Sequence, residues 1–180
     1  MADTPGVHSN ASNFQSFVQN NVDQRTGQYN LAIDLPVPAG NDLTGPGLPL
    51  RLSYSPFSNE DSGFGTGWRL AMTRYEPATR MLTLHTGESY KVTGTGAQPT
   101  IREKKIHSFH FYDDGTAADE DKGPYRVVHK SGLVEILTLH DKLNPIALPS
   151  KVRAPSGQGL TLHYIPESRR LARIVDDNGT

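Results

Sequence analysis

The stretch LPLRLSYSPFSNEDSGFGTGWRLAM, residues 48–72, decides the fold, and it holds the only tryptophan of the chain. Large apolar side chains occupy alternate positions on both sides of a glycine-rich segment: Leu48, Leu50, Leu52 and Tyr54 before it, and Trp68, Leu70 and Met72 after it. A period of two places such side chains on one face of a strand. The sequence therefore predicts two amphipathic strands joined by a turn at residues 62–67, with an apolar face that other strands must cover.

Composition and charge set limits on the whole chain. Its 180 residues suffice for one core, or for one domain and the beginning of a second. A net charge of −1 gives no general attraction to nucleic acid or to anionic membranes. No run of about 18 apolar residues predicts a membrane span, and the first residues lack the pattern of a secretory signal, so we expect synthesis in the cytoplasm. The absence of cysteine excludes disulfides, thiolate zinc and a cysteine nucleophile.

The rest of the chain reads as short strands separated by turns. Its 17 glycines and 13 prolines are spread along the sequence, and long helical patterns are missing. We expect strands at residues 29–35, 48–54, 68–72, 81–85, 89–92, 106–112, 125–129, 133–139, 151–153, 160–164 and 170–176. The short connections between them are typical of antiparallel hairpins. The predicted fold class is all-β, an antiparallel meander or sandwich.

The last third of the chain is more regular than the rest. Turn glycines recur at nearly even spacing, at Gly132, Gly157 and Gly179. A recurring strand–turn–strand unit at such a period indicates a repeat architecture.

Two parts of the sequence resemble Rhs/YD-repeat proteins. Residues 159–164 (GLTLHY) and 169–179 (RRLARIVDDNG) are similar to one repeat, a strand ending in Tyr-Asp, a Gly-Arg-Leu turn and an Ile-x-Asp-x-x-Gly ending. Ile165 stands in place of the Asp, and Arg169 in place of the Gly, so the copy is divergent. Residues 22–31, 48–56, 63–68 and 82–88 resemble the amino-terminal region of large proteins of this family.

The resemblance implies a structural role. Rhs repeats wind a β-strand ribbon into a hollow shell that encloses a carboxy-terminal toxin, as in polymorphic toxins and the C components of insecticidal toxin complexes. We therefore expect a non-catalytic amino-terminal part of such a shell, without the toxin. Its partners would be the rest of the shell, the enclosed toxin and a secretion-apparatus or toxin-complex component. Export would use a specialised secretion system.

The resemblance also suggests four regions. Residues 1–21 form a polar tail, and residues 22–92 an amino-terminal β-domain. Residues 93–124 are a linker with one strand and an acidic loop, and residues 125–180 begin the Rhs/YD-like ribbon.

Few residues suggest chemistry. No nucleophile elbow or catalytic triad stands out, so the protein is not expected to be an enzyme or to bind a cofactor. Carboxylates of the acidic loop could offer oxygen ligands to calcium: Asp113, Asp114, Asp119 and Asp121. The loop lacks the spacing of an EF-hand, so a solvated hairpin tip is the favoured interpretation. His107 and His110 point to opposite faces of a strand and cannot share a metal.

Several large side chains are instead expected to be structural anchors: Tyr54, Phe64, Trp68, Tyr164, Leu171 and Ile174. The alternative function is a carbohydrate-binding β-sandwich, in which Tyr29, Tyr54, Phe64 and Trp68 form a platform for sugar rings. Because the alternation places Tyr54 and Trp68 with leucines, core packing is the favoured role of both.

Overall fold

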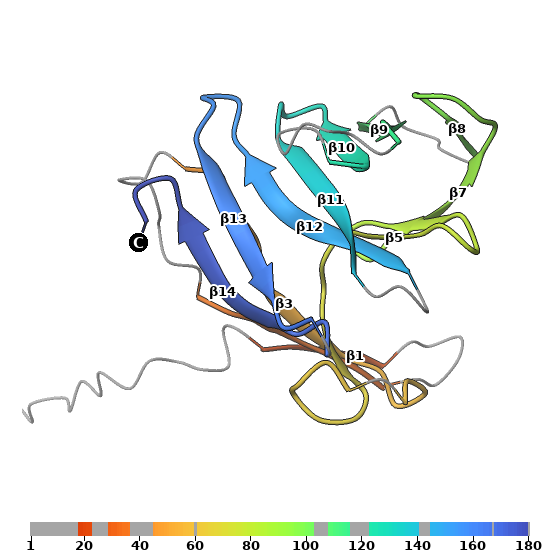
Figure 1. Ribbon diagram of the computed structural model, residues 1–180. Helices are drawn as coiled ribbons and strands as arrows, with labels where there is room; N and C mark the ends of the chain where they lie inside the picture. The colour runs from red at the N-terminus through yellow and green to blue at the C-terminus, as the bar shows by residue number, and fades with distance from the viewer. Residues whose placement is uncertain are drawn as a thin grey trace, which may run out of the picture.

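The computed structural model describes residues 18–22, 29–36, 45–59, 61–102, 108–115, 123–140, 145–166 and 168–179. These residues form strands, turns and bends, and they contain no helix that could cross a membrane. The strands lie in two antiparallel sheets (Figure 1). The all-β antiparallel prediction is therefore confirmed.

The first sheet contains the stretch that opened the sequence analysis. Its four strands lie in chain order: β1 (Val18–Val22), β2 (Tyr29–Asp34), β3 (Arg51–Tyr54) and β4 (Trp68–Leu70). In the β3–β4 pair, Tyr54 lies opposite Trp68 and their ring centroids are 5.3 Å apart. Leu52 lies opposite Leu70 in the same pair. The predicted strand pair is thus present, although β3 begins at Arg51 rather than at Leu48.

The turn before β4 depends on a buried glycine. Gly67 has a φ of +87°, and a Cβ placed there would lie 2.8 Å from Cε2 of Tyr54 and 2.9 Å from the carbonyl oxygen of Ser55. The Ser55 N–H donates to the Gly67 carbonyl at 2.9 Å, so the backbone cannot easily retreat. Only glycine fits this position.

We expect Gly67→Ala to lower the free energy of unfolding by about 3 kcal/mol, because backbone strain and a steric clash act together. Gly87→Ala is the matched control, since Gly87 has a φ of +95° but open space around a Cβ. That variant should lose only about 1–2 kcal/mol. Urea unfolding of both variants measures the difference, and equal losses would show that the contact with Tyr54 does not matter.

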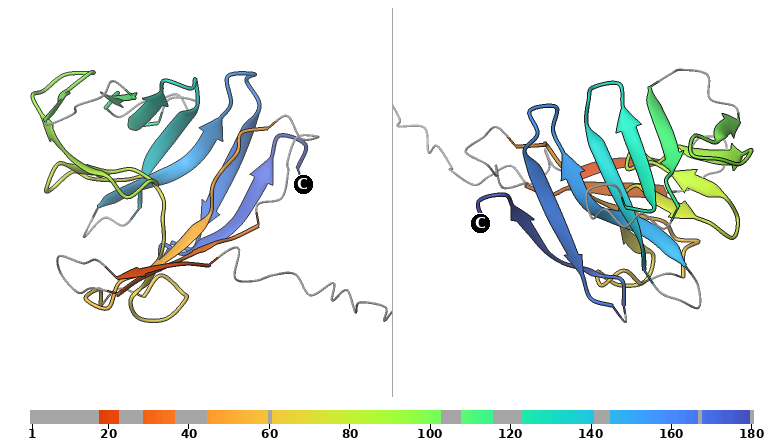
Figure 2. Two further views of the ribbon diagram at one scale, coloured as in Figure 1. Left: turned by 180° about the vertical axis from the view of Figure 1, so that it is seen from behind. Right: turned by 45° about the horizontal axis from the view of Figure 1, so that its top comes forward.

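The second sheet holds the remaining ten strands: β5 (Arg74–Glu76), β6 (Met81–Thr83), β7 (Ser89–Thr93), β8 (Thr100–Arg102), β9 (Phe109–Asp113), β10 (Tyr125–His129), β11 (Val134–His140), β12 (Ile146–Arg153), β13 (Gly159–Tyr164) and β14 (Leu171–Asp176). Eight of them follow the order β8-β7-β6-β5-β12-β11-β10-β9. The hairpin β13–β14 is attached to β12 outside this order (Figure 2).

Strand β12 is the junction of the second sheet. Near its beginning Ala147 pairs with Tyr75 of β5, whereas residues 151–153 pair with residues 159–161 of β13. Strand β11 runs along its other edge with a register irregularity after Ile136, next to Pro149. Proline is tolerated at such irregularities because it has no N–H to offer the ladder.

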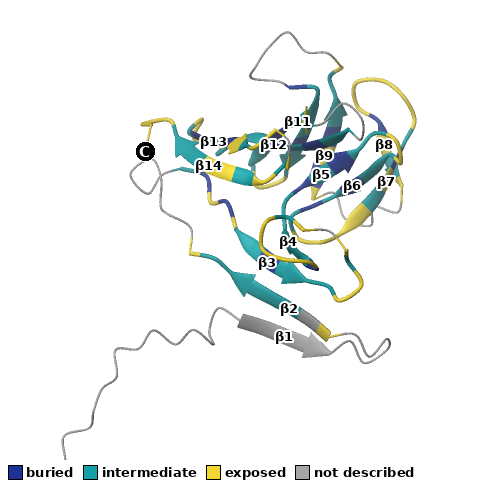
Figure 3. Cartoon of the chain, turned by 60° about the horizontal axis from the view of Figure 1, so that its bottom comes forward, coloured by how far each residue is buried: buried dark blue, intermediate teal, exposed yellow. Residues whose placement is uncertain are grey.

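The eight-stranded part of this sheet curls until its ends approach each other. The Asp113 N–H at the end of β9 donates to the Ala97 carbonyl between β7 and β8, at 2.9 Å. The curl encloses a cluster of buried side chains: Tyr75, Leu82, Leu84, Val92, Phe109, Phe111, Val127, Leu137 and Ala147. Figure 3 shows buried residues concentrated in this sheet. This cluster is the main core.

A second cluster joins the two sheets. Leu48, which precedes β3, is buried against Val152, Leu160 and Leu162 of β12 and β13. In Figure 1, β3 crosses behind the β13–β14 hairpin, and in the rear view of Figure 2 (left) the orange β3 lies in front of that hairpin. The beginning of the apolar face predicted for residues 48–54, Leu48 and Leu50, is therefore covered by β12 and the carboxy-terminal hairpin.

The evenly spaced glycines mark three turns of one kind. The N–H groups of Gly132, Gly157 and Gly179 each donate to the carbonyl three residues earlier, at 2.9, 2.9 and 3.0 Å. The first two of these turns touch, because a Cβ on Gly132 would lie 2.7 Å from Cγ of Pro155. The repeat seen in the sequence thus corresponds to the turns that follow β10, β12 and β14.

The structure also contains strands that the sequence did not predict. Residues 18–22, which overlap the end of the predicted polar tail (1–21), form β1, and β5, β8 and the first half of β12 were likewise not expected. The chain passes from the first sheet to the second at residues 71–73. The four proposed regions stay predictions.

Candidate functional site

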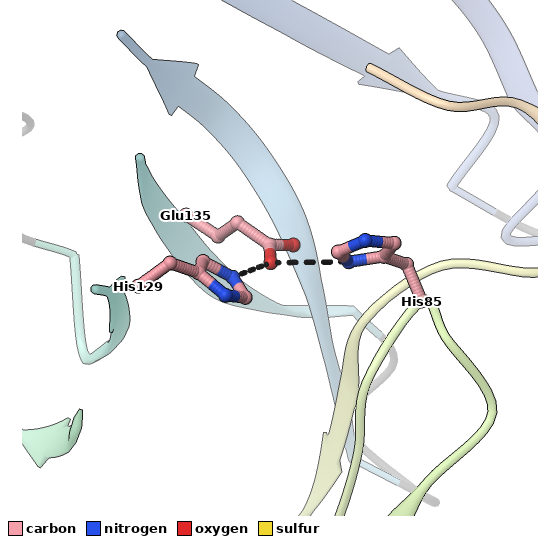
Figure 4. Close-up of side chains that lie close together, drawn as sticks. All are labelled: His85, His129 and Glu135. Atoms are coloured by element: carbon pink, nitrogen blue, oxygen red, sulfur yellow. Dashed lines mark hydrogen bonds and ion pairs between the residues drawn. The ribbon is translucent and has the colours of Figure 1, made fainter. Parts of the chain in front are cut away.

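A buried carboxylate between two imidazole rings is the most unusual polar feature of the described residues (Figure 4). His85 follows β6, His129 ends β10, and Glu135 lies on β11. Oε1 of Glu135 lies 2.5 Å from Nε2 of His129 and 3.6 Å from Nδ1 of His85. Three segments of the chain therefore converge on one oxygen atom.

Thr73 completes this group. Its hydroxyl donates to Oε1 of Glu135 at 3.0 Å and accepts the backbone N–H of His85 at 3.2 Å. Both Thr73 and Glu135 are buried, with exposed fractions of 0% and 2%. These four side chains connect three parts of the chain: the segment between β4 and β5, the residues after β6, and the β10–β11 hairpin.

The electrostatics of the group favour an ionised glutamate. Burial raises the pKa of Glu135, but hydrogen bonds from His129, His85 and Thr73 outweigh it and lower the pKa to about 2. At neutral pH the carboxylate is therefore a fixed negative charge inside the protein. We call His85, His129, Glu135 and Thr73 the carboxylate cluster.

Tyr164 lies near this charge. Its hydroxyl donates to the Pro149 carbonyl at 2.8 Å, and its ring centroid is 4.6 Å from that of His140. Burial, and secondly the charge of Glu135, raise the pKa of Tyr164 well above its ordinary value. Burial, and secondly the charge of Arg169, lower the pKa of His140.

We expect the raised pKa of Tyr164 to make the protein lose stability in alkali. Below a pH of about 10, the Tyr164 phenol is protonated in both the folded and the unfolded protein, so the raised pKa does not change the free energy of unfolding. As the pH rises further, the unfolded chain releases this proton and the folded protein keeps it, so the free energy of unfolding falls.

Alkaline unfolding followed by tyrosinate absorbance and circular dichroism tests this expectation. The number of tyrosines that ionise only together with unfolding should be one smaller in Tyr164→Phe than in the wild type. Tyr29→Phe is a suitable control because Tyr29 is 45% exposed. Ionisation of every tyrosine before any unfolding would contradict the assignment.

A cavity of about 250 Å³ lies beside Tyr164. Apolar side chains from both sheets line it, among them Phe64, Leu70, Leu148 and Leu171. Its polar lining includes Arg170, whose Nη2 lies 3.7 Å from Oδ2 of Asp61. The cavity therefore combines an apolar wall with an ion pair between exposed side chains.

The acidic-loop residues are only partly described. Asp114 binds Arg126, with oxygen–nitrogen distances of 3.1 and 3.4 Å. Oδ1 of Asp113 accepts the Gly115 N–H at 3.3 Å. Asp119, Asp121 and His107 lie outside the described residues. His110 is exposed, and its ring contacts Gln98 at 3.2 Å. Metal binding by this loop stays a hypothesis.

The predicted anchors have different environments. Tyr164, Leu171 and Ile174 pack against the second cluster of buried residues. Tyr54 and Trp68 lie ring against ring and are half-buried, whereas Phe64 is 49% exposed.

Sequence reasoning missed the carboxylate cluster. One part of it had a signal: His129 and Glu135 flank the Lys130-Ser131-Gly132 turn, and Val127 pairs with Glu135. Residues so placed in a hairpin are diagonal neighbours on one face. His85 and Thr73 reach the site only through long-range pairing, which no local pattern predicts.

Comparisons with known proteins give a fold but no family. No family model matches the chain, and no curated protein sequence does. Solved structures with the same fold do exist, and those described next are of Tc toxins.

One is the crystal structure of TcdB2-TccC3, with a TM-score of 0.56 and 12% identity over 82% of this chain. Another is the Photorhabdus luminescens Tc holotoxin pore with a TccC3 variant, with a TM-score of 0.52 and 14% identity over 82%. The chain covers 9% and 8% of those chains. The similarity therefore establishes a shared fold with a small part of much longer toxin-complex proteins.

Proposed function

We propose that this chain is a non-catalytic, structural part of an Rhs-type shell that encloses a toxin. The observation that carries the proposal is the run of antiparallel strands β10–β14, whose turns are evenly spaced and of one kind. The shared fold with TcdB2-TccC3 over 82% of the chain supports it. In this proposal the rest of the shell, the enclosed toxin and a delivery component are the partners.

The physical basis of the proposal is the open edge of the sheet. Strand β14 pairs with β13 and has no second neighbour among the described strands. An outer strand presents backbone N–H and C=O groups that favour pairing with another strand. A wall made of such ribbons grows by adding hairpins, and each new hairpin covers the edge of the one before it.

The test asks whether the outer edge of β14 pairs with a second copy of the chain. The purified chain should self-associate with increasing concentration in analytical ultracentrifugation. Ala172 is exposed on β14, and it has no paired residue on β13 because the register shifts there. Ala172→Pro removes a backbone donor and should weaken association, whereas Ala172→Ser keeps the donor and should not.

Hydrogen exchange gives a measurement that does not depend on the variant. Backbone amides of β14 should exchange more slowly at high protein concentration than at low concentration, while those of β6 should not change. A chain that stays monomeric, or that associates without protecting β14, would contradict the proposal.

Carbohydrate binding is the second candidate, favoured by the exposure of Phe64 and Tyr29, at 49% and 45%. A glycan array tests it directly. Binding that Phe64→Ala abolishes would support a glycan site, and an array without any binding would argue against it.

A further inference from the structure

We propose that His85, His129 and Glu135 form a binding site for a divalent cation of the zinc type. Their ligand atoms all lie within 4.8 Å of one another, although they come from three segments of the chain (Figure 4). The inference depends only on these side chains and is independent of the shell proposal.

The ligand types suit such an ion. Two imidazole nitrogens and one carboxylate oxygen are the protein ligands of many zinc sites, where a fourth position is left for water. Imidazole favours zinc and its neighbours in the transition series over calcium or magnesium. The set is therefore chemically distinct from the oxygen ligands of the acidic loop.

The two distances from the Glu135 oxygen to the imidazole nitrogens can be compared with those of a zinc site. Ligand atoms of a tetrahedral zinc ion lie roughly 3.3 Å apart, given bonds of about 2.0–2.2 Å. The 3.6 Å between His85 and Glu135 is close to this value, whereas the 2.5 Å between His129 and Glu135 is a hydrogen bond. Binding would replace that bond: the shared proton leaves, and the two atoms separate by about 0.8 Å.

The surroundings hold the ligands in place. Thr73 donates to the Glu135 carboxylate and accepts the backbone N–H of His85, so one hydroxyl orients two of the ligands. Partners of this kind are a regular part of metal sites. The side chains of His85 and His129 are 23% and 14% exposed, which leaves the imidazoles accessible from solvent.

A bound ion would have a structural effect. It would join the loop after β6 to the β10–β11 hairpin, two segments on different parts of the curled sheet. An ion that binds only the folded protein stabilises it in proportion to its affinity and concentration.

The experiment uses the whole chain, stripped with a chelator and then titrated with zinc. Calorimetry should show one strong equivalent, and the melting temperature should rise with zinc concentration. His85→Gln should weaken binding at least tenfold. The matched control is His110→Gln, since His110 is exposed on β9 and outside the carboxylate cluster, and it should bind as the wild type does.

Cobalt provides a readout that does not depend on any variant. The wild type loaded with one equivalent of Co²⁺ should show the intense visible absorption of a four-coordinate ion. A weak, octahedral-type spectrum would overturn the proposal, as would an unchanged melting temperature. Equal zinc affinity in His85→Gln and wild type would place the ion on other histidines, and would overturn it too.

Discussion

Phe109→Ala is expected to lower the free energy of unfolding by about 3–5 kcal/mol. Phe109 lies on β9 with an exposed fraction of 0% and belongs to the main core. Its ring centroid lies 5.2 Å from that of Tyr90 on β7, across the interior of the curled sheet. Truncation removes buried apolar surface and leaves a cavity between strands that backbone pairing holds apart.

Urea unfolding followed by circular dichroism measures this loss. The matched control is Phe57→Ala, because Phe57 is 79% exposed, and its stability should change by less than about 0.5 kcal/mol. Similar losses in the two variants would show that the curled sheet does not enclose the main core.

Glu135→Gln is expected to cost about 3 kcal/mol at neutral pH in a buffer that contains a chelator. The substitution removes the buried charge that His129, His85 and Thr73 hydrogen-bond. The control is Asp34→Asn, which breaks the ion pair with Arg51. That pair is exposed, with side-chain fractions of 39% and 41%, so its loss should cost no more than about 1 kcal/mol.

The same comparison has a pH dependence whose sign follows from the lowered pKa of Glu135. A carboxylate with a depressed pKa stabilises the folded state fully above its unfolded value, near 4.5, and this contribution disappears as the pH falls towards about 2. The groups that face it are His85, His129, Thr73 and Tyr164. The difference between wild type and Glu135→Gln should therefore narrow between pH 4.5 and 2. A constant difference over this range would mean that the charge of Glu135 contributes nothing.

The alternation of apolar and polar residues predicted those strands that have one buried face and one more exposed face. Leu160 and Leu162 of β13 alternate with polar residues and belong to the second cluster, and Leu52 of β3 is buried between Arg51 and Ser53. Strands β5 and β8 escaped prediction because neither belongs to a longer alternating run, whereas the equally short β4 and β6 do. Pro149 also concealed the first half of β12, since proline in a run of residues normally argues against a strand.

The carboxylate cluster shows a second limit. Pairing of β10 with β11 is local, so the proximity of His129 and Glu135 can be anticipated from the hairpin. The position of Thr73 depends on the pairing of β5 with β12, more than seventy residues apart, which only the complete fold determines. The alternation of residues along a sequence therefore cannot predict a site whose residues are brought together by long-range strand pairing.

The pairing of β12 with the distant strand β5 has a consequence for the order in which the strands form during synthesis. Strands β5–β8 pair with near neighbours and can form as soon as they leave the ribosome. The outer edge of β5 stays bare until Ala147 emerges, and contacts so distant in sequence form slowly. We therefore expect closure of the curled sheet to be the late step of folding. Until it occurs, the nascent chain is most exposed to pairing with the wrong strand.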